Sequence, residues 1–247
     1  MLAIIGGSGL TQLSSLEVTF RKAARTPYGE PSGALTFGKL RGRDVAFLAR
    51  HGYGHTIPPH EVNYRANIWT LREEGATEIV SVASVGGIRA DLGPGMLVIP
   101  HQIIDYTWGR RSTFFEGGDV PVSHVDFTAP YSEPLRQKLL AGARACGEPV
   151  LDGAVYAATQ GPRLETAAEI DRLERDGADM VGMTGMPEAA LASEIGLCYA
   201  TLAVVANRAA GRAGGAAISM PDIAAVLEPA MGRVRSILAK LVASGGG

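Results

Sequence analysis

The sequence predicts an α/β fold in one domain, and three observations favour it. The chain has 247 residues, of which 46% are hydrophobic, enough for one sizeable core. Short apolar runs that end in glycine alternate with amphipathic segments, a pattern typical of strands followed by helices. No linker or internal repeat divides the chain, so we expect a single domain over residues 1–247.

The composition of the chain argues against several classes of function. The formal net charge is −2 and the pI is about 6.2, so nucleic-acid binding is not expected and a phosphate-bearing ligand would need local donors. Cys146 and Cys198 are too few for a disulfide framework or a metal cluster, and the apolar neighbours of Cys198 predict a buried thiol. With no cationic leader and no apolar stretch of membrane length, we expect a cytoplasmic protein.

The first predicted strand, residues 2–5, runs into a glycine-rich loop at residues 6–9. Backbone N–H groups of such a loop can bind an anion. Gln12 stands where a dinucleotide fingerprint needs its third glycine, and Leu10 stands where a nucleophile elbow needs its last one. Ser8 is therefore predicted to donate to a phosphate and not to act as a nucleophile.

Arg50 ends a predicted strand at residues 44–49 and is followed by His51 and a glycine. The forked donors of a guanidinium at a strand end suit oxyanion binding, although a surface ion pair is an equally common role for such an arginine. His51 and His55 could face each other only on a helix, and the glycines and prolines around them predict a loop. We therefore expect no metal site.

Two further strand ends carry polar groups. A strand at residues 78–84 ends at Ser84 beside paired glycines, and an apolar strand at residues 197–206 runs into Asn207. Residues 108–130 are rich in glycine, serine and aromatic residues and predict a long functional or interface loop. The other predicted elements are helices at 62–74, 134–146 and 220–242 and short strands at 97–100 and 102–105.

Residues 160–188 contain two turns at strand ends, separated by a predicted helix at 167–176. The first turn has a Gly-Pro pair, and the second has a hydroxyl residue followed by a glycine. Because α/β proteins bind their ligands at strand ends, Glu165, Met183 and Thr184 are expected to meet in one region. The alternative is that the glycines and prolines only form turns.

Five short sequence blocks follow one another along nearly the whole chain. They are Gly6-Gly7-Ser8-Gly9-Leu10, Arg50-His51-Gly52, VNYRANIW at 62–69, QGPRLET at 160–166 and GMTGMPE at 182–188. Together they resemble the family of trimeric purine nucleoside phosphorylases and methylthioadenosine phosphorylases, and within it the bacterial S-methyl-5′-thioinosine phosphorylases. The resemblance implies a three-layer α/β/α domain with a central mixed sheet.

The resemblance also implies a reaction that uses inorganic phosphate as co-substrate and needs no cofactor or metal. Phosphate attacks C1′ of a purine nucleoside and releases the base and a ribose 1-phosphate. The implied assembly is a homotrimer, possibly a hexamer, with active sites at the subunit interfaces.

The resemblance assigns a role to each site residue, and Asn207, Arg50 and Glu165 are the expected catalytic ones. Phosphate would be bound by Ser8, Arg50, His51, Ser84 and Thr184, the base by Leu164, Glu165, Asn207 and Ala209, and the sugar by Met183, His55, Met220, Ile223 and His124 of a neighbouring copy.

Two positions predict which base is bound. Asn207 and Ala209 stand where adenosine-type members of the family have aspartates. An asparagine amide can donate to O6 and accept from protonated N7, and Glu165 can accept from N1–H, which hypoxanthine has and adenine lacks. The wrong base would leave buried groups unpaired, so a 6-oxopurine is expected. The alternative role for Asn207 is to cap a turn.

Two positions predict which sugar is bound. Met220 stands where family members that use a 5′-hydroxyl carry a histidine, and Met220 and Ile223 together suit a 5′-methylthio group. Alternatively, both residues simply begin the apolar stripe of the last helix.

The predicted function is therefore phosphorolysis of S-methyl-5′-thioinosine to hypoxanthine and 5-methylthioribose 1-phosphate. A methylthioadenosine phosphorylase or an inosine/guanosine phosphorylase is the alternative within the family. A nucleoside hydrolase and a non-catalytic purine-binding protein are the alternatives outside it.

Overall fold

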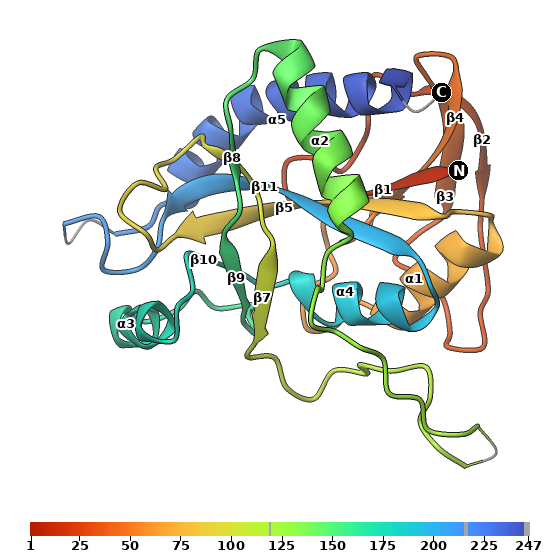
Figure 1. Ribbon diagram of the computed structural model, residues 1–247, viewed down its shortest axis with the longest axis horizontal. Helices are drawn as coiled ribbons and strands as arrows, with labels where there is room; N and C mark the ends of the chain where they lie inside the picture. The colour runs from red at the N-terminus through yellow and green to blue at the C-terminus, as the bar shows by residue number, and fades with distance from the viewer. Residues whose placement is uncertain (119, 215–216, 245–247) are drawn as a thin grey trace.

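The long strand β5 (Glu78–Gly87) is the centre of the fold in the computed structural model, which describes residues 1–118, 120–214 and 217–244. On one side β5 pairs along its length with β11 (Cys198–Arg208). On the other side its first half pairs with β1 (Leu2–Gly6) and its last two residues pair with β10 (Met180–Gly182). The sheet therefore branches at the C-terminal end of β5 (Figure 1).

The remaining strands extend this sheet in both directions. They are β2 (Glu17–Lys22), β3 (Leu35–Leu40), β4 (Arg43–Ala49), β6 (Leu97–Ile99), β7 (Gln102–Asp105), β8 (Val150–Asp152) and β9 (Val155–Ala158). The order is β2-β3-β4-β1-β5-β10-β9-β7, with β6 and β8 joined through β11. Parallel pairs such as β1 with β4 and antiparallel pairs such as β3 with β4 occur together, so the sheet is mixed.

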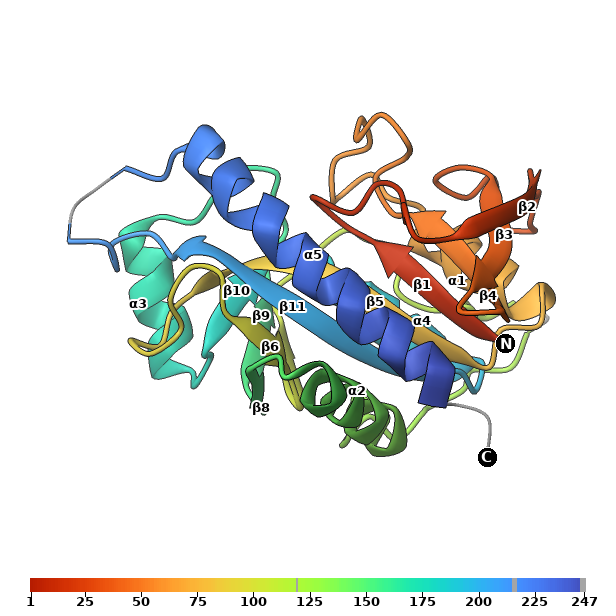
Figure 2. The ribbon, with the colours of Figure 1, turned by 90° about the horizontal axis from the view of Figure 1, so that it is seen from above.

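Helices cover both faces of the sheet (Figures 1 and 2). The helices α2 (Glu133–Cys146) and α5 (Met220–Ser244) pack on one face, and α1 (Tyr64–Glu73) and α4 (Gly185–Glu194) pack on the other. The short helix α3 (Ala167–Arg175) has its own small apolar cluster beside β9 and β10. These three layers around a mixed sheet confirm the predicted fold. No helix in the described ranges is long and apolar enough to span a bilayer.

Side-chain caps fix where the helices near the strand ends begin. Thr166 and Glu169 form a capping box at the start of α3, in which the Thr166 hydroxyl accepts from the Glu169 N–H at 3.1 Å and the Glu169 carboxylate accepts from the Thr166 N–H at 2.7 Å. The chain between β9 and α3 therefore has a defined end point, and this is the turn that carries Glu165.

The sequence pattern does not reveal β2, β3 and β8, and it places the ends of β5 and β11 too early. Every residue of β2 is exposed, so this strand has no buried face that a pattern could show. β5 and β11 continue through Gly87 and Arg208 because the two strands pair with each other to their ends.

The prediction that Cys198 is a buried thiol is wrong, because this residue is exposed. It is the first residue of β11, and the next eight residues, which point alternately to the two faces of the sheet, are buried. The thiol is therefore exposed because it lies at the end of the strand. The apolar neighbours indicated the strand but not where its buried part begins.

Candidate active site

A cavity of about 420 Å³ lies where β1, β4, β5, β10 and β11 end. Its walls contain each residue that the sequence predicted for phosphate, base or sugar binding, apart from His124. The residues of this set that line the cavity are Ser8, Arg50, His51, His55, Ser84, Leu164, Glu165, Met183, Thr184, Asn207, Ala209, Met220 and Ile223. Segments far apart in the sequence thus meet in one place, and the roles of the single residues stay predictions.

His124 lies apart from this cavity. It is exposed, and it belongs to the segment of residues 106–132, which projects from the body of the molecule (Figure 1). The described part of this segment has no helix or strand, so the predicted long loop is confirmed. The predicted contribution of His124 to the site of a neighbouring copy stays a prediction.

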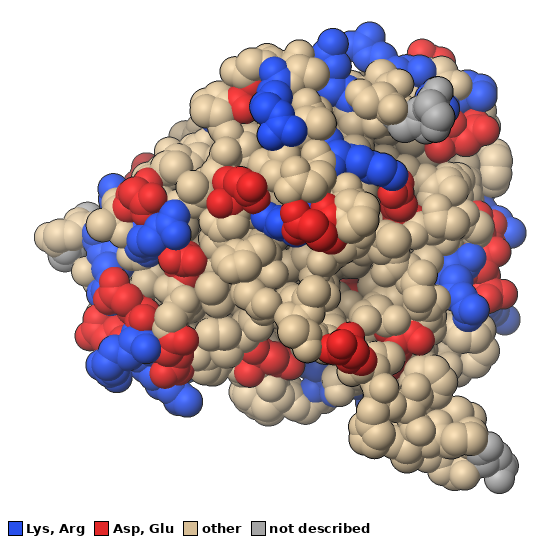
Figure 3. Space-filling model, in the orientation of Figure 1, with Lys and Arg blue, Asp and Glu red and all other residues tan. Residues whose placement is uncertain are grey.

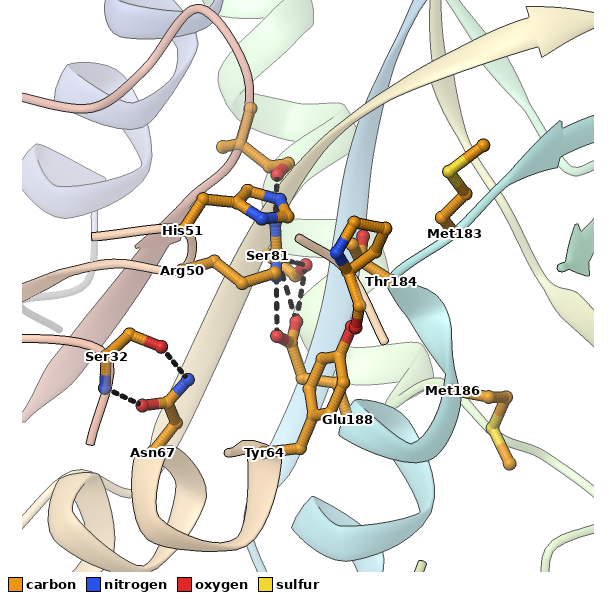
Figure 4. Close-up of polar contacts among 12 residues, drawn as sticks. Ser32, Arg50, His51, Tyr64, Asn67, Ser81, Met183, Thr184, Met186 and Glu188 are labelled. Carbon is orange, nitrogen blue, oxygen red and sulfur yellow. Dashed lines mark hydrogen bonds and ion pairs between the residues drawn. The ribbon is translucent and has the colours of Figure 1, made fainter. Parts of the chain in front are cut away.

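Arg50 is fully buried at the end of β4 and points at Glu188 (Figure 4). Its Nε and Nη2 donate to the Glu188 carboxylate at 2.7 and 2.8 Å, its Nη2 also donates to Ser81 Oγ at 2.6 Å, and its Nη1 donates to the Val82 carbonyl at 3.1 Å. A guanidinium has five N–H groups, so one N–H on Nη1 remains for a ligand. A Cβ at Gly7 would lie 2.8 Å from Nη1, so only glycine lets the first loop come this close.

Glu188 keeps Arg50 charged although both side chains are buried. Burial alone would lower the pKa of Arg50, but the ion pair and hydrogen bonds with Glu188 outweigh it and raise that pKa. Glu188 also accepts from Ser81 Oγ and from the Tyr199 hydroxyl, each at 2.8 Å. The alternative role considered for Arg50 was a surface ion pair. Arg50 does form an ion pair, but it is buried inside the protein.

His51 and His55 face each other, with ring centroids 4.7 Å apart, although they lie in a loop. The prediction that only a helix could bring them together is wrong, because positive φ angles of 74° at Gly52 and 51° at His55 fold the loop back. Burial, followed by the charge of Arg50, lowers the pKa of His51 to about 4. His51 is thus neutral near pH 7, and its Nδ1–H donates to the Ile57 carbonyl at 2.8 Å, which leaves Nε2 as an acceptor.

Asn207 and Glu165 line the cavity away from Arg50, since Asn207 is aligned with Gly86 near the end of β5 whereas Arg50 contacts Ser81 and Val82 nearer its middle. The register of β11 against β5 shifts between Val205 and Asn207, and such a bulge changes the direction of the side chains around it. Asn207 Nδ2 donates to the Arg208 carbonyl at 2.7 Å, which leaves its second N–H and its Oδ1 for a ligand. Glu165 Oε1 accepts from the Thr159 hydroxyl at 2.7 Å.

Met183 and Met220 form apolar parts of the wall. A Cβ at Gly161 would overlap Sδ of Met183, so the chain after β9 packs directly on this side chain. Met220 is 67% exposed at the start of α5, which argues against the alternative that it begins the core stripe of that helix. Ile223, one turn later, packs partly against the core and also lines the cavity.

The sequence did not single out Ser81, Tyr199 or Arg110 as parts of the site. Ser81 and Tyr199 are polar residues inside apolar strands, and this was the only signal available for them. Arg110 lies in the long loop beside a second arginine, and nothing in the sequence separates the two. In the structure Arg110 donates to main-chain carbonyls behind the cavity, including that of Met183.

Comparison with known proteins places this geometry in a family. A model of the Phosphorylase superfamily matches residues 1–243. A protein of Pseudomonas syringae pv. tomato named probable S-methyl-5′-thioinosine phosphorylase is 54% identical, over 98% of this chain and 98% of its own. A protein of Xanthomonas campestris with the same name is 51% identical, over 97% of this chain and 96% of its own.

Two less similar relatives are named for other purine nucleoside substrates. A 6-oxopurine nucleoside phosphorylase of Pyrococcus furiosus is 47% identical, over 86% of this chain and 81% of its own. The solved structure of methylthioadenosine phosphorylase from Schistosoma mansoni in complex with adenine matches with a TM-score of 0.93 and 32% identity, over 98% of this chain and 90% of that one. The chain therefore belongs to the phosphorylase superfamily.

Proposed function

We propose that the protein catalyses the phosphorolysis of S-methyl-5′-thioinosine to hypoxanthine and 5-methylthioribose 1-phosphate. One observation carries this proposal: a single cavity has a charged donor, Arg50, at one end and the pair Asn207 and Glu165 at the other. Phosphate can therefore bind beside Arg50 and the purine beside Asn207 and Glu165, with the sugar of the nucleoside between them. The names of the bacterial relatives support the same substrate.

In the proposed reaction, an oxygen of phosphate forms a bond to C1′ while the bond between C1′ and N9 breaks. Positive charge on the sugar is stabilised by the phosphate, which Arg50, Ser8 and Thr184 would hold. The electron pair of the broken bond goes to the purine, which takes up a proton from solvent at N7. Oδ1 of Asn207 would then accept a hydrogen bond from N7–H.

The geometry at the base end supports hypoxanthine. One oxygen of Glu165 is held by Thr159, and the other has no protein donor in the described part of the chain, so it can accept from N1–H. The second N–H of Asn207 can donate to O6. Adenine would present a donor to that N–H and an acceptor to Glu165, and both mismatches would leave buried groups unpaired.

The test is phosphate-dependent base release from methylthioinosine, methylthioadenosine, inosine and adenosine in parallel. We expect methylthioinosine to have the highest kcat/KM. A faster reaction of inosine would overturn the interpretation of Met220 and Ile223, and a faster reaction of methylthioadenosine would overturn that of Asn207 and Glu165. Release without phosphate would identify a hydrolase, and no release from any substrate would leave only a purine-binding protein.

We infer that the active assembly is a homotrimer in which residues 106–132 contact a neighbouring copy. The exposed side chains of Trp108, Val120 and Val122 give this segment an apolar surface. Figure 3 shows the projection as largely uncharged, whereas acidic and basic residues are interspersed over the rest of that face. A hexamer and a cytoplasmic location stay predictions.

A further inference from the structure

Arg110 lies behind the cavity, at the point where the chains that leave β9 and β10 separate. One branch continues through Gln160 towards Glu165, and the other continues through Met183 into α4. Nη2 of Arg110 donates to the carbonyls of Thr159 and Gln160 at 3.2 and 2.8 Å. Nη1 donates to the carbonyls of Met183 and Met186 at 2.8 and 2.5 Å. One guanidinium therefore joins the two branches.

The remaining contacts of Arg110 use up its donors. Nε donates to Gln160 Oε1 at 3.1 Å, and Nη1 also lies 3.3 Å from the Tyr64 hydroxyl. The side chain is partly buried, and within the described residues no carboxylate forms an ion pair with it. Its charge is thus balanced by carbonyl dipoles of the two branches, so a substitution would leave several carbonyls unpaired together.

Both branches carry residues of the cavity. Met183 supplies one of the carbonyls that Arg110 binds, and its sulfur packs on Gly161 in the other branch. Thr159, whose carbonyl is also bound, donates its hydroxyl to Glu165. A change in the separation of the branches would therefore move the sugar-binding and base-binding walls.

Arg50, the charged phosphate donor, is held by contacts other than those of Arg110. Its partners are Glu188 and Ser81, which lie on α4 and β5. The backbone N–H of Thr184 donates to the Tyr156 hydroxyl at 3.3 Å, and it belongs to the same peptide group as the Met183 carbonyl that Arg110 binds. Arg110 therefore contacts the phosphate-binding residues only through the backbone next to Thr184.

We propose that Arg110 is a positioning residue that sets the distance between Met183 and Glu165 and so affects nucleoside affinity more strongly than phosphate affinity. This inference rests on the proposed function. Arg110 does not line the cavity, so it acts through the two branches and not on the substrate itself.

The experiment measures separate KM values for methylthioinosine and for phosphate in Arg110→Gln, with Arg111→Gln as the matched control. Arg111 has the same charge and the neighbouring position, but its side chain is 75% exposed and, among the residues that the structure describes, pairs only with Glu116. We expect Arg110→Gln to raise the nucleoside KM about tenfold or more, while the phosphate KM rises clearly less because Arg50 keeps its own partners. Arg111→Gln should change neither value.

Two further variants keep the test decisive if Arg110→Gln folds poorly. Arg110→Lys retains the charge, but an ammonium cannot span both branches, so the nucleoside KM should still rise. Gln160→Leu removes the acceptor that Nε shares with the Trp108 N–H but keeps the four carbonyl contacts, so it should raise the nucleoside KM less. Partial misfolding would lower kcat alone, because KM does not depend on the amount of active enzyme.

An unchanged nucleoside KM in Arg110→Gln and Arg110→Lys, or an equal rise in both KM values, would overturn the inference while the proposed function stands. A wild-type protein that releases no base from any nucleoside would instead overturn the proposed function. The two failures are therefore distinguishable in the same set of assays.

Discussion

The choice of base depends on which atoms of residue 207 can donate. In Asn207 one N–H is bound to the Arg208 carbonyl, and the other can donate to O6 of a 6-oxopurine. An aspartate has no N–H, and its carboxylate would be repelled by the same carbonyl, so it would turn towards the base as an acceptor. Such an acceptor suits the amino group of adenine.

We therefore expect Asn207→Asp to shift the ratio of kcat/KM for methylthioadenosine over methylthioinosine upwards by roughly ten- to a hundredfold. The ratio is measured on one enzyme preparation, so losses of folded protein cancel. Glu165 still favours N1–H in this variant, so the shift need not reverse the preference. An unchanged ratio would show that Asn207 serves as a turn cap and does not read the base.

The residues that line the cavity were predicted from the sequence better than the residues that hold those side chains in place. Ser8, Arg50 and Thr184 stand at predicted strand ends within two residues of a glycine. This local pattern can be recognised in the sequence alone. Glu188, Ser81 and Tyr199 hold Arg50 from distant positions, and only the folded chain shows that their oxygens meet. Likewise, the contact between His51 and His55 depends on positive φ angles that residue types alone do not specify.

At the scale of elements, the predicted strands have a buried face, but a buried face was not sufficient, because β3 is buried at five of its six residues and was missed. β1, β4 and β11 have long buried runs, and their positions were predicted to within a few residues. β2 is exposed throughout and β8 has three residues, so neither shows a periodicity. The ends of β5 and β11 were misplaced because strand pairing, and not the pattern of either strand, determines where they stop.

The packing between β9 and β10 leads to a second prediction. Gly161 has a φ of 60°, and a Cβ there would overlap Met183. Gly161→Ala should therefore displace Met183 and raise the nucleoside KM roughly tenfold. The matched control is Gly177→Ala, because Gly177 has a φ of 93° but nothing within 4 Å of the added Cβ.

Both glycine variants should lose about 1 kcal/mol of unfolding free energy to backbone strain. Only Gly161→Ala should change KM, as measured by initial rates at saturating phosphate. Equal KM values in the two variants would show that the wall tolerates a shift of Met183, and would remove that side chain from the sugar-binding surface.

At the scale of the whole molecule, one chain supplies a cavity but not every residue that was predicted for it. His124 lies on a projecting segment away from its own cavity, and the exposed apolar residues of that segment favour contact with a second copy. In a cyclic trimer each segment would reach one neighbour, so every active site would combine two chains. This arrangement can be tested without a structure of the assembly.

Mixed trimers of His124→Ala and Glu165→Ala should regain activity that neither variant has alone. If each site takes Glu165 from one chain and His124 from the next, random reassembly restores both residues at roughly a quarter of the sites. The measurement is the initial rate at methylthioinosine below KM, before and after the two variants are unfolded and refolded together, with each variant refolded alone as the control. A rate equal to the mean of the two variants would place His124 outside the neighbour's site. A restored rate would show that the projecting segment completes it, and the exposed apolar side chains of this segment would then be explained by burial in the assembly.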